Sequence, residues 1–144
     1  MGIFVHILSG RDYMTNNEIL INIQVIDEIK NYKLPISVMW QITKNLHTFS
    51  DLVKLYNEER VNIIKRYAKK DENGEVIEEN GETVFPDENT RIKCISEISE
   101  LMAQDNKEIQ IAKVTLDDLK ACDSEQFTSL SIEQIYALSF MIEE

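Results

Sequence analysis

The residues that most often carry catalysis or bind metals are few in this sequence and lie far apart. His6 stands in an apolar stretch and His47 in a segment of helical periodicity, and neither has a Cys, an Asp or a second His at the spacing of a metal site. Cys94 and Cys122 form no CxxC pattern, so we expect free thiols in a reducing cytoplasm. The sequence therefore predicts no metal centre.

Loops that bind nucleotides or calcium are also not indicated. The four glycines form no Gly-rich phosphate loop, and no Ser or Cys stands in the elbow motif of a nucleophile. Residues 71–82 span the twelve positions of a calcium loop, but Val76 occupies the position that needs a glycine. We expect no catalytic residue, no metal and no cofactor, and hence a protein that is not an enzyme.

Carboxylates are the one chemical group that gathers in one place. The net charge is −11, and residues 1–70 carry +3 while residues 71–144 carry −14. Residues 71–90 hold eight acids and no basic residue. Such an acidic protein is a poor ligand for a phosphate backbone, so we expect no direct binding to nucleic acid. The residues predicted to bind a partner are Glu75, Glu78, Glu79, Glu82, Asp87 and Glu88.

This acidic cluster has two interpretations. It is a contact surface for a basic groove, such as that of a nucleic-acid-binding protein, or it is a solvated edge whose charge prevents aggregation between strands. Part of the acid in the second half of the chain is also expected to face the basic first half.

One long helix positions the acidic cluster. Apolar residues recur from Met39 to Tyr67 at alternating spacings of three and four, which is the a/d pattern of a helical seam. Only Arg60 interrupts this stripe, and a buried cation is costly unless it is paired. We expect Arg60 to reach solvent or to pair with an acid of the returning helix, such as Glu97 or Glu100, and to set the register of the seam.

Two aromatic residues of this helix, Trp40 and Phe49, are expected in the core or in the seam, with an interface as the alternative for one of them. The apolar face of the helix is wide. It can be covered within one chain or by a second copy, which leaves a homodimer open.

The sequence after the long helix predicts a β-hairpin. Asn80-Gly81 is the favoured two-residue type I′ turn, and it places Glu79 opposite Glu82 and Glu78 opposite Thr83. A returning helix follows. Asp87, Asn89 or Thr90 can cap it. Its predicted inward stripe is Ile92, Ile95, Ile98 and Met102.

The pattern as a whole predicts one mainly α (α+β) domain over residues 1–144. A long antiparallel helical hairpin carries the β-hairpin at its tip, and the N- and C-terminal helices pack at its base. Capping boxes at Thr15 and Ser131 begin those two helices, and the last helix is expected to turn Ile132, Ile135, Leu138 or Ser139, and Ile142 inward. A short two-stranded sheet between residues 108–112 and the N-terminal strand is a further expectation. The predicted segments are an apolar strand or extension (1–14), a helix (15–33), the long helix (35–70), the β-hairpin (75–85), the returning helix (88–103), a short strand and turn (108–119) and the C-terminal helix (131–143).

The cellular location follows from what the sequence lacks. No apolar run approaches the ~18 residues of a membrane span, and the apolar start has no basic flank of the kind a signal peptide carries. We therefore expect a cytoplasmic protein without membrane contact.

Three motifs, spread in order along the chain, are Lys33-Leu-Pro-Ile36, Tyr67-Ala-Lys-Lys-Asp-Glu-Asn-Gly74 and Ser131-Ile-Glu-Gln-Ile-Tyr-Ala-Leu-Ser-Phe-Met-Ile142. Through them residues 17–144 resemble a family of uncharacterised small proteins encoded by phages and prophages of Gram-positive bacteria. That family has no known activity or catalytic residue, so the resemblance implies only a phage context in a bacterial host cell.

Together with the acidic cluster, this resemblance predicts a non-enzymatic phage-type protein that acts by binding a protein partner. The leading hypothesis is an inhibitor or modulator of host defence or nucleic-acid machinery. The alternative is a phage structural, assembly or chaperone-like protein that oligomerises through its helical seam.

Overall fold

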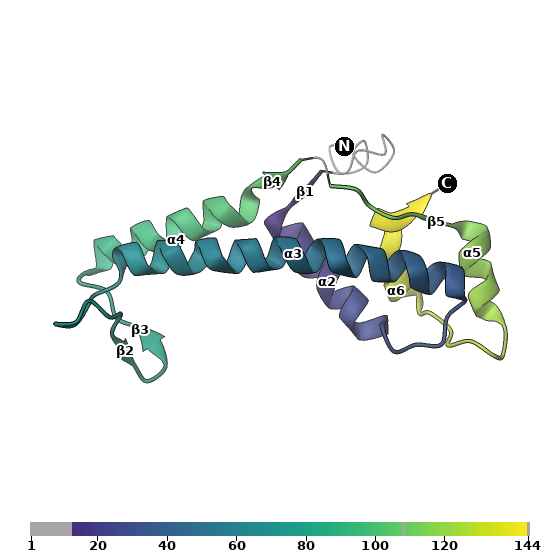
Figure 1. The fold of residues 1–144 in the computed structure, drawn as a ribbon, viewed down its shortest axis with the longest axis horizontal. Coiled ribbons are helices and arrows are strands. Elements are labelled where there is room, and N and C mark those ends of the chain that lie inside the picture. Colours follow the sequence, from purple (N-terminus) through teal and green to yellow (C-terminus); the bar gives the residue numbers. More distant parts are fainter. Residues whose placement is uncertain (1–12, 108, 144) are drawn as a thin grey trace. The chain divides into compact units, whose positions relative to one another are not determined.

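The computed structural model describes residues 13–107 and 109–143, and these are mostly helical, as predicted (Figure 1). They form two compact units: unit 1 comprises the described residues up to Val53 and from Asp105 onward, and unit 2 comprises Lys54–Gln104. Helix α3 (Ile36–Tyr67) contributes residues to both units. Almost all of the predicted N-terminal strand or extension, including His6, lies outside the described residues.

Unit 1 begins with strand β1 (Met14–Thr15), which leads directly into helix α2 (Asn16–Ile29). The predicted capping box is present. The Thr15 hydroxyl accepts a hydrogen bond from the Glu18 N–H at 3.1 Å, and the Glu18 carboxylate accepts one from the Thr15 N–H at 3.2 Å. The buried apolar residues of α2 are Ile19, Ile26 and Ile29.

The two aromatic residues predicted for the core or seam have different environments. Phe49 is fully buried in unit 1, and its ring centroid lies 5.6 Å from that of Phe140. Trp40 is 61% exposed, so its prediction as a core or seam residue is wrong. The two side chains lie on different faces of α3 because nine residues at 100° per residue amount to two and a half turns.

The buried face of α3 in unit 1 keeps Ile42 and Phe49 of the predicted stripe but differs from it at two other positions. Val38 and Asn45 are buried, whereas their neighbours in the predicted stripe, Met39 and Leu46, are exposed and half-buried respectively. The prediction selected the apolar residue at each turn, and that rule excluded Asn45. The face is fixed instead by what α3 packs against.

The predicted strand over residues 108–112 is wrong for the described residues 109–112, which form no strand. The Asn45 side chain takes the place of a neighbouring strand: its Nδ2 donates to the Ala112 carbonyl at 2.9 Å, and its Oδ1 accepts from the Ala112 N–H at 2.7 Å. Ile109 and Ile111 are buried in the core of unit 1. The alternation of apolar and polar residues over 108–112 therefore does not indicate a strand. It indicates an extended segment that the Asn45 side chain holds by hydrogen bonds.

Short pairs of strands flank this extended segment. Strand β4 (Asp105–Asn106) is antiparallel to β1, with Met14 opposite Asn106. Strand β5 (Val114–Thr115) is parallel to β6 (Ile142–Glu143). Both pairs lie in unit 1.

The C-terminal part of unit 1 contains helix α5 (Leu116–Lys120), the 3₁₀ helix η1 (Ala121–Asp123), helix α6 (Ile132–Ala137) and the 3₁₀ helix η2 (Leu138–Met141). The capping box of Ser131 and Gln134 is present, as predicted.

The predicted last helix, however, is too long, and its first two inward positions are wrong. The α-helix ends after six residues, and Ile132 and Ile135 are exposed. Leu138 is buried, as predicted, and Met141 is buried with it, because the 3₁₀ turn that follows α6 places residues three apart on one face.

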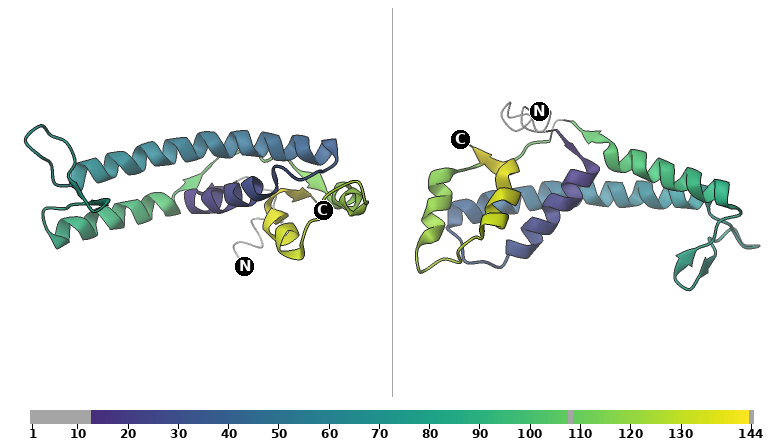
Figure 2. Two further views of the ribbon diagram at one scale, coloured as in Figure 1. Left: turned by 90° about the horizontal axis from the view of Figure 1, so that it is seen from below. Right: turned by 180° about the vertical axis from the view of Figure 1, so that it is seen from behind.

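Unit 2 contains the C-terminal part of α3, strands β2 (Glu78–Glu79) and β3 (Glu82–Thr83), and helix α4 (Glu88–Ala103). Within this unit α4 lies beside α3 in every view (Figures 1 and 2). Asn80 and Gly81 have φ angles of 53° and 79°, as a type I′ turn requires.

Backbone hydrogen bonds attach the β-hairpin to the residues that follow α3. The Lys69 N–H donates to the Val84 carbonyl at 2.8 Å, and the Lys69 carbonyl accepts from the Ile77 N–H at 3.0 Å. Lys69 therefore contacts both arms of the hairpin.

The predicted inward stripe of α4 is wrong at its first two positions. Ile92 and Ile95 are exposed, whereas Cys94 is buried. The face around Cys94 is the one that contacts α3, since Glu97, one turn further along, pairs with Arg66 of α3. One residue along a helix is a rotation of about 100°, so a small error of phase exchanges buried and exposed residues.

Candidate functional site

All six acids predicted to bind a partner belong to unit 2 and are exposed. Two of them have local roles. The Asp87 carboxylate caps α4 by accepting from the Thr90 N–H at 2.7 Å, which lowers the pKa of Asp87. Glu88 forms an ion pair with Arg91, and the hydrogen bonds in that pair lower the pKa of Glu88.

The hairpin carries the remaining charge. Glu79 lies directly opposite Glu82, and Glu78 lies opposite Thr83. Like charges directly opposite one another destabilise a strand pair. Because successive strand residues point to opposite faces, Glu78 and Glu79 place negative charge on both faces of the hairpin. We call Glu75, Glu78, Glu79 and Glu82 the acidic tip.

Asp71 organises the turn before the hairpin. Its Oδ1 accepts from the Asn73 N–H at 2.8 Å and from the Glu75 N–H at 3.0 Å, so the carboxylate is used to hold the chain. Within residues 13–107 and 109–143, no group of three or more His, Cys, Asp or Glu side chains is placed to hold a metal ion. The chemistry that the acidic tip supports is attraction of cationic side chains.

Arg60, the residue that interrupts the predicted seam, is exposed. The ion pair with Glu97 is made by Arg66 instead, at 3.3 Å. The Glu97 carboxylate beside Tyr67 also raises the pKa of the Tyr67 hydroxyl. In this register it is Arg66, and not Arg60, that links α3 to the returning helix.

The two cysteines and the described histidine show no arrangement for nucleophilic catalysis. Cys94 and Cys122 are free and buried, and burial raises the pKa of both thiols. A raised pKa keeps a thiol in its unreactive protonated form. His47 is exposed on α3.

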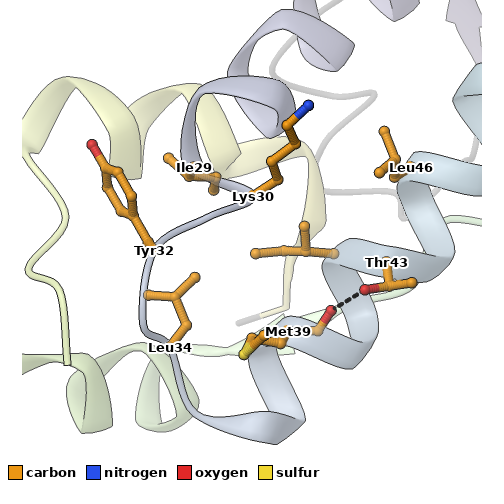
Figure 3. Close-up of a pocket in the computed structure, with 8 residues that line it drawn as sticks. Ile29, Lys30, Tyr32, Leu34, Met39, Thr43 and Leu46 are labelled. Atoms are coloured by element: carbon orange, nitrogen blue, oxygen red, sulfur yellow. Dashed lines mark hydrogen bonds between the residues drawn. The ribbon is translucent and has the colours of Figure 1, made fainter. Parts of the chain in front are cut away.

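A small hollow lies in unit 1 between the end of α2 and the first turns of α3 (Figure 3). Its volume is about 40 Å³, far below the several hundred Å³ of a typical ligand pocket. Tyr32 lines it and accepts a hydrogen bond on its hydroxyl from Gln134 Nε2 at 2.9 Å. The hollow has room for a methyl group or a water molecule. It is too small for a cofactor.

Sequence reasoning missed the polar anchor of unit 1. Besides Asn45, Gln41 also binds the extended segment, through a hydrogen bond of 2.8 Å from its Nε2 to the Lys113 carbonyl. Asn45 lies three residues after Ile42 and four before Phe49, both of which are buried. The signal in the sequence was a polar residue in line with buried apolar residues on one face of the helix.

Comparison with protein-family models, with curated proteins and with solved structures finds no match. The resemblance to phage-encoded proteins therefore stays an expectation. Among the described helices, none combines the length and the apolar character needed to cross a bilayer.

The Asp87 cap gives a testable pH dependence. Because the folded state lowers the pKa of Asp87, the charged cap contributes stability above the ordinary carboxyl pKa and loses it as the pH falls through the lowered value. Near neutral pH the wild type should be more stable than an Asp87→Asn variant. In acid the free energies of unfolding of the two proteins should become equal. Urea unfolding at several pH values, together with NMR titration of the Asp87 carboxyl, checks this. A carboxyl that titrates at its ordinary pKa would contradict it.

Proposed function

We propose that this is a non-enzymatic phage-type protein of the bacterial cytoplasm that binds a basic protein partner through the acidic tip, and so inhibits or modulates host defence or nucleic-acid machinery. The observation that carries the proposal is the direct opposition of Glu79 and Glu82 in a stretch, residues 71–90, that contains no basic residue. This arrangement costs stability in the free protein. Features that break a local rule of stability are expected where they serve function.

The simpler explanation, protection of a strand edge, accounts for less of the observation. One charge or a proline is enough to blunt a two-residue edge strand. Residues 71–90 hold eight acids and no lysine or arginine, so a negative field remains although Glu88 pairs with Arg91. Such a field raises the association rate with a basic groove and is weakened by salt.

The predicted architecture is part of this proposal. A long antiparallel helical hairpin would present the β-hairpin at its tip, with the terminal helices at its base. On that arrangement the acidic tip would be free to reach a partner's groove.

A second candidate is a structural, assembly or chaperone-like role in a phage. The exposed apolar residues Ile36 and Trp40 on α3 favour it, since adjacent exposed apolar side chains often mark protein contacts. This role does not need the acidic tip.

The experiment compares two variants in which four glutamates are changed to glutamine. One changes the acidic tip. The control removes the same number of charges at exposed glutamates outside it, namely Glu28, Glu58, Glu59 and Glu125. Tagged proteins are used to capture partners from a lysate of the bacterial host, with elution in a salt gradient and identification by mass spectrometry.

We expect the wild type and the control variant to capture a basic nuclease, polymerase or repressor, and the acidic-tip variant to lose it. Direct titration of the purified partner should show affinity that falls steeply with salt, because screening shortens the range of exposed charges to about 10 Å at 0.1 M. If the acidic-tip variant captures the same partners as wild type, the proposal is wrong. Capture of phage structural proteins by all three proteins would favour the assembly role.

A further inference from the structure

Two exposed apolar faces of unit 1 have no partner within the described chain. On α3, Ile36 is 84% and Trp40 is 61% exposed, and they lie one helical turn apart with the exposed Met39 beside them. On α6, Ile132 is 86% and Tyr136 is 80% exposed at the same spacing.

These faces do not cover each other within one copy. Both belong to unit 1, in which the core is already closed by other residues, such as Ile42 of α3 and Leu138 of η2. Large apolar and aromatic side chains that stay exposed after the core is complete are typical of contact surfaces between proteins.

The two faces carry opposite charge. Residues 29–50, which contain the α3 face, hold three lysines and no acid, and the Lys44 ammonium lies 5.6 Å from the centre of the Trp40 ring. Residues 121–143, which contain the α6 face, hold four acids and no basic residue, and Glu133 stands exposed next to Ile132. The two faces are therefore complementary: both are apolar, and the positive charge of the α3 face matches the negative charge of the α6 face.

We propose that the α3 face of one copy (Ile36, Met39, Trp40 and Lys44) binds the α6 face of a second copy (Ile132, Glu133 and Tyr136). The aromatic side chains supply buried apolar area, and the lysine and glutamate favour this pairing over α3 with α3 or α6 with α6. A second copy is the occupant that brings both complementary faces. The contact is separate from the acidic tip, so it stands or falls independently of the proposed function.

The test is the mass of the full chain in solution. One chain has a mass of 16.8 kDa, and light scattering after size exclusion should show a larger mass as the concentration rises from about 5 to 500 μM. Trp40→Gln and Tyr136→Gln should each weaken the association at least about tenfold, as loss of an aromatic anchor does. Leu55→Gln is the matched control, because Leu55 is also 61% exposed on α3 but lies in unit 2 outside the α3 face.

A mixing experiment tests which face binds which. A tagged Trp40→Gln chain keeps an intact α6 face and should capture an untagged Tyr136→Gln chain, whose α3 face is intact, while failing to capture untagged Trp40→Gln. Circular dichroism verifies that each variant is folded, which is expected because all three positions are exposed.

Three results would overturn the inference: the mass of one chain at every concentration, an equal loss of association in Leu55→Gln, or failure of the two variants to capture each other. Monomeric protein that binds vesicles containing phosphatidylglycerol through Trp40 would also overturn it, and would assign the α3 face to a membrane surface.

Discussion

Replacing Phe49 with alanine is expected to lower the free energy of unfolding by about 3–5 kcal/mol, the usual cost of truncating a buried phenylalanine. Phe49 is the largest fully buried side chain of the described chain, and it packs against Phe140 in the core of unit 1. The change removes apolar contacts and leaves a cavity that the surrounding helices close only in part. Urea unfolding followed by circular dichroism measures it, and Phe49→Leu should give a smaller loss of about 1 kcal/mol.

Trp40→Ala is the matched control for this prediction. It truncates a larger aromatic residue of the same helix, but one that is mostly exposed and contacts Lys44. The stability should change by less than about 1 kcal/mol, the scale of an exposed cation–π contact. A loss in Trp40→Ala equal to that in Phe49→Ala would show that the buried face of α3 has been assigned wrongly.

Asn45→Ala is expected to destabilise the protein by about 2–4 kcal/mol, since it leaves both the N–H and the carbonyl of Ala112 without their side-chain partner. Alanine has the higher helix propensity, so an intrinsic effect on α3 would act in the opposite direction. Urea unfolding measures the loss. Hydrogen exchange of the Ala112 amide should also accelerate more than that of amides in α4.

Asn57→Ala makes the same chemical change at an exposed position of α3, and its effect should stay within about 0.5 kcal/mol. Asn45→Asp separates the two hydrogen bonds, because the carboxylate still accepts from the Ala112 N–H but cannot donate to the carbonyl. Wild-type stability in Asn45→Ala would mean that the extended segment 109–113 does not depend on this anchor.

The local features of this fold were predictable because their causes lie within a few residues of one another. The Thr15 capping box, the Ser131 capping box and the Asn80-Gly81 turn each need only their own side chains and backbone angles. The long helix was predictable for the same reason, since its periodic pattern contains no glycine or proline between Ile36 and Tyr67.

The acidic tip could be predicted in part. The sequence placed Glu79 opposite Glu82, and the structure pairs them. It offered Asp87 as one of three caps for α4, and the structure selects it. It did not reveal that Glu88 pairs with Arg91. These roles set the two acids apart from the other four.

The sequence by itself determined the helical character of the chain, the ends of several elements and the concentration of acid at the hairpin. Only the tertiary structure decided which face of each helix is buried: Asn45 rather than Leu46 on α3, Cys94 rather than Ile95 on α4, and Met141 rather than Ile135 after α6. The physical reason is that a helix with apolar residues around much of its circumference has several faces of similar hydrophobicity. The choice among them is made by contacts and hydrogen bonds with distant segments, such as that of Asn45 with Ala112.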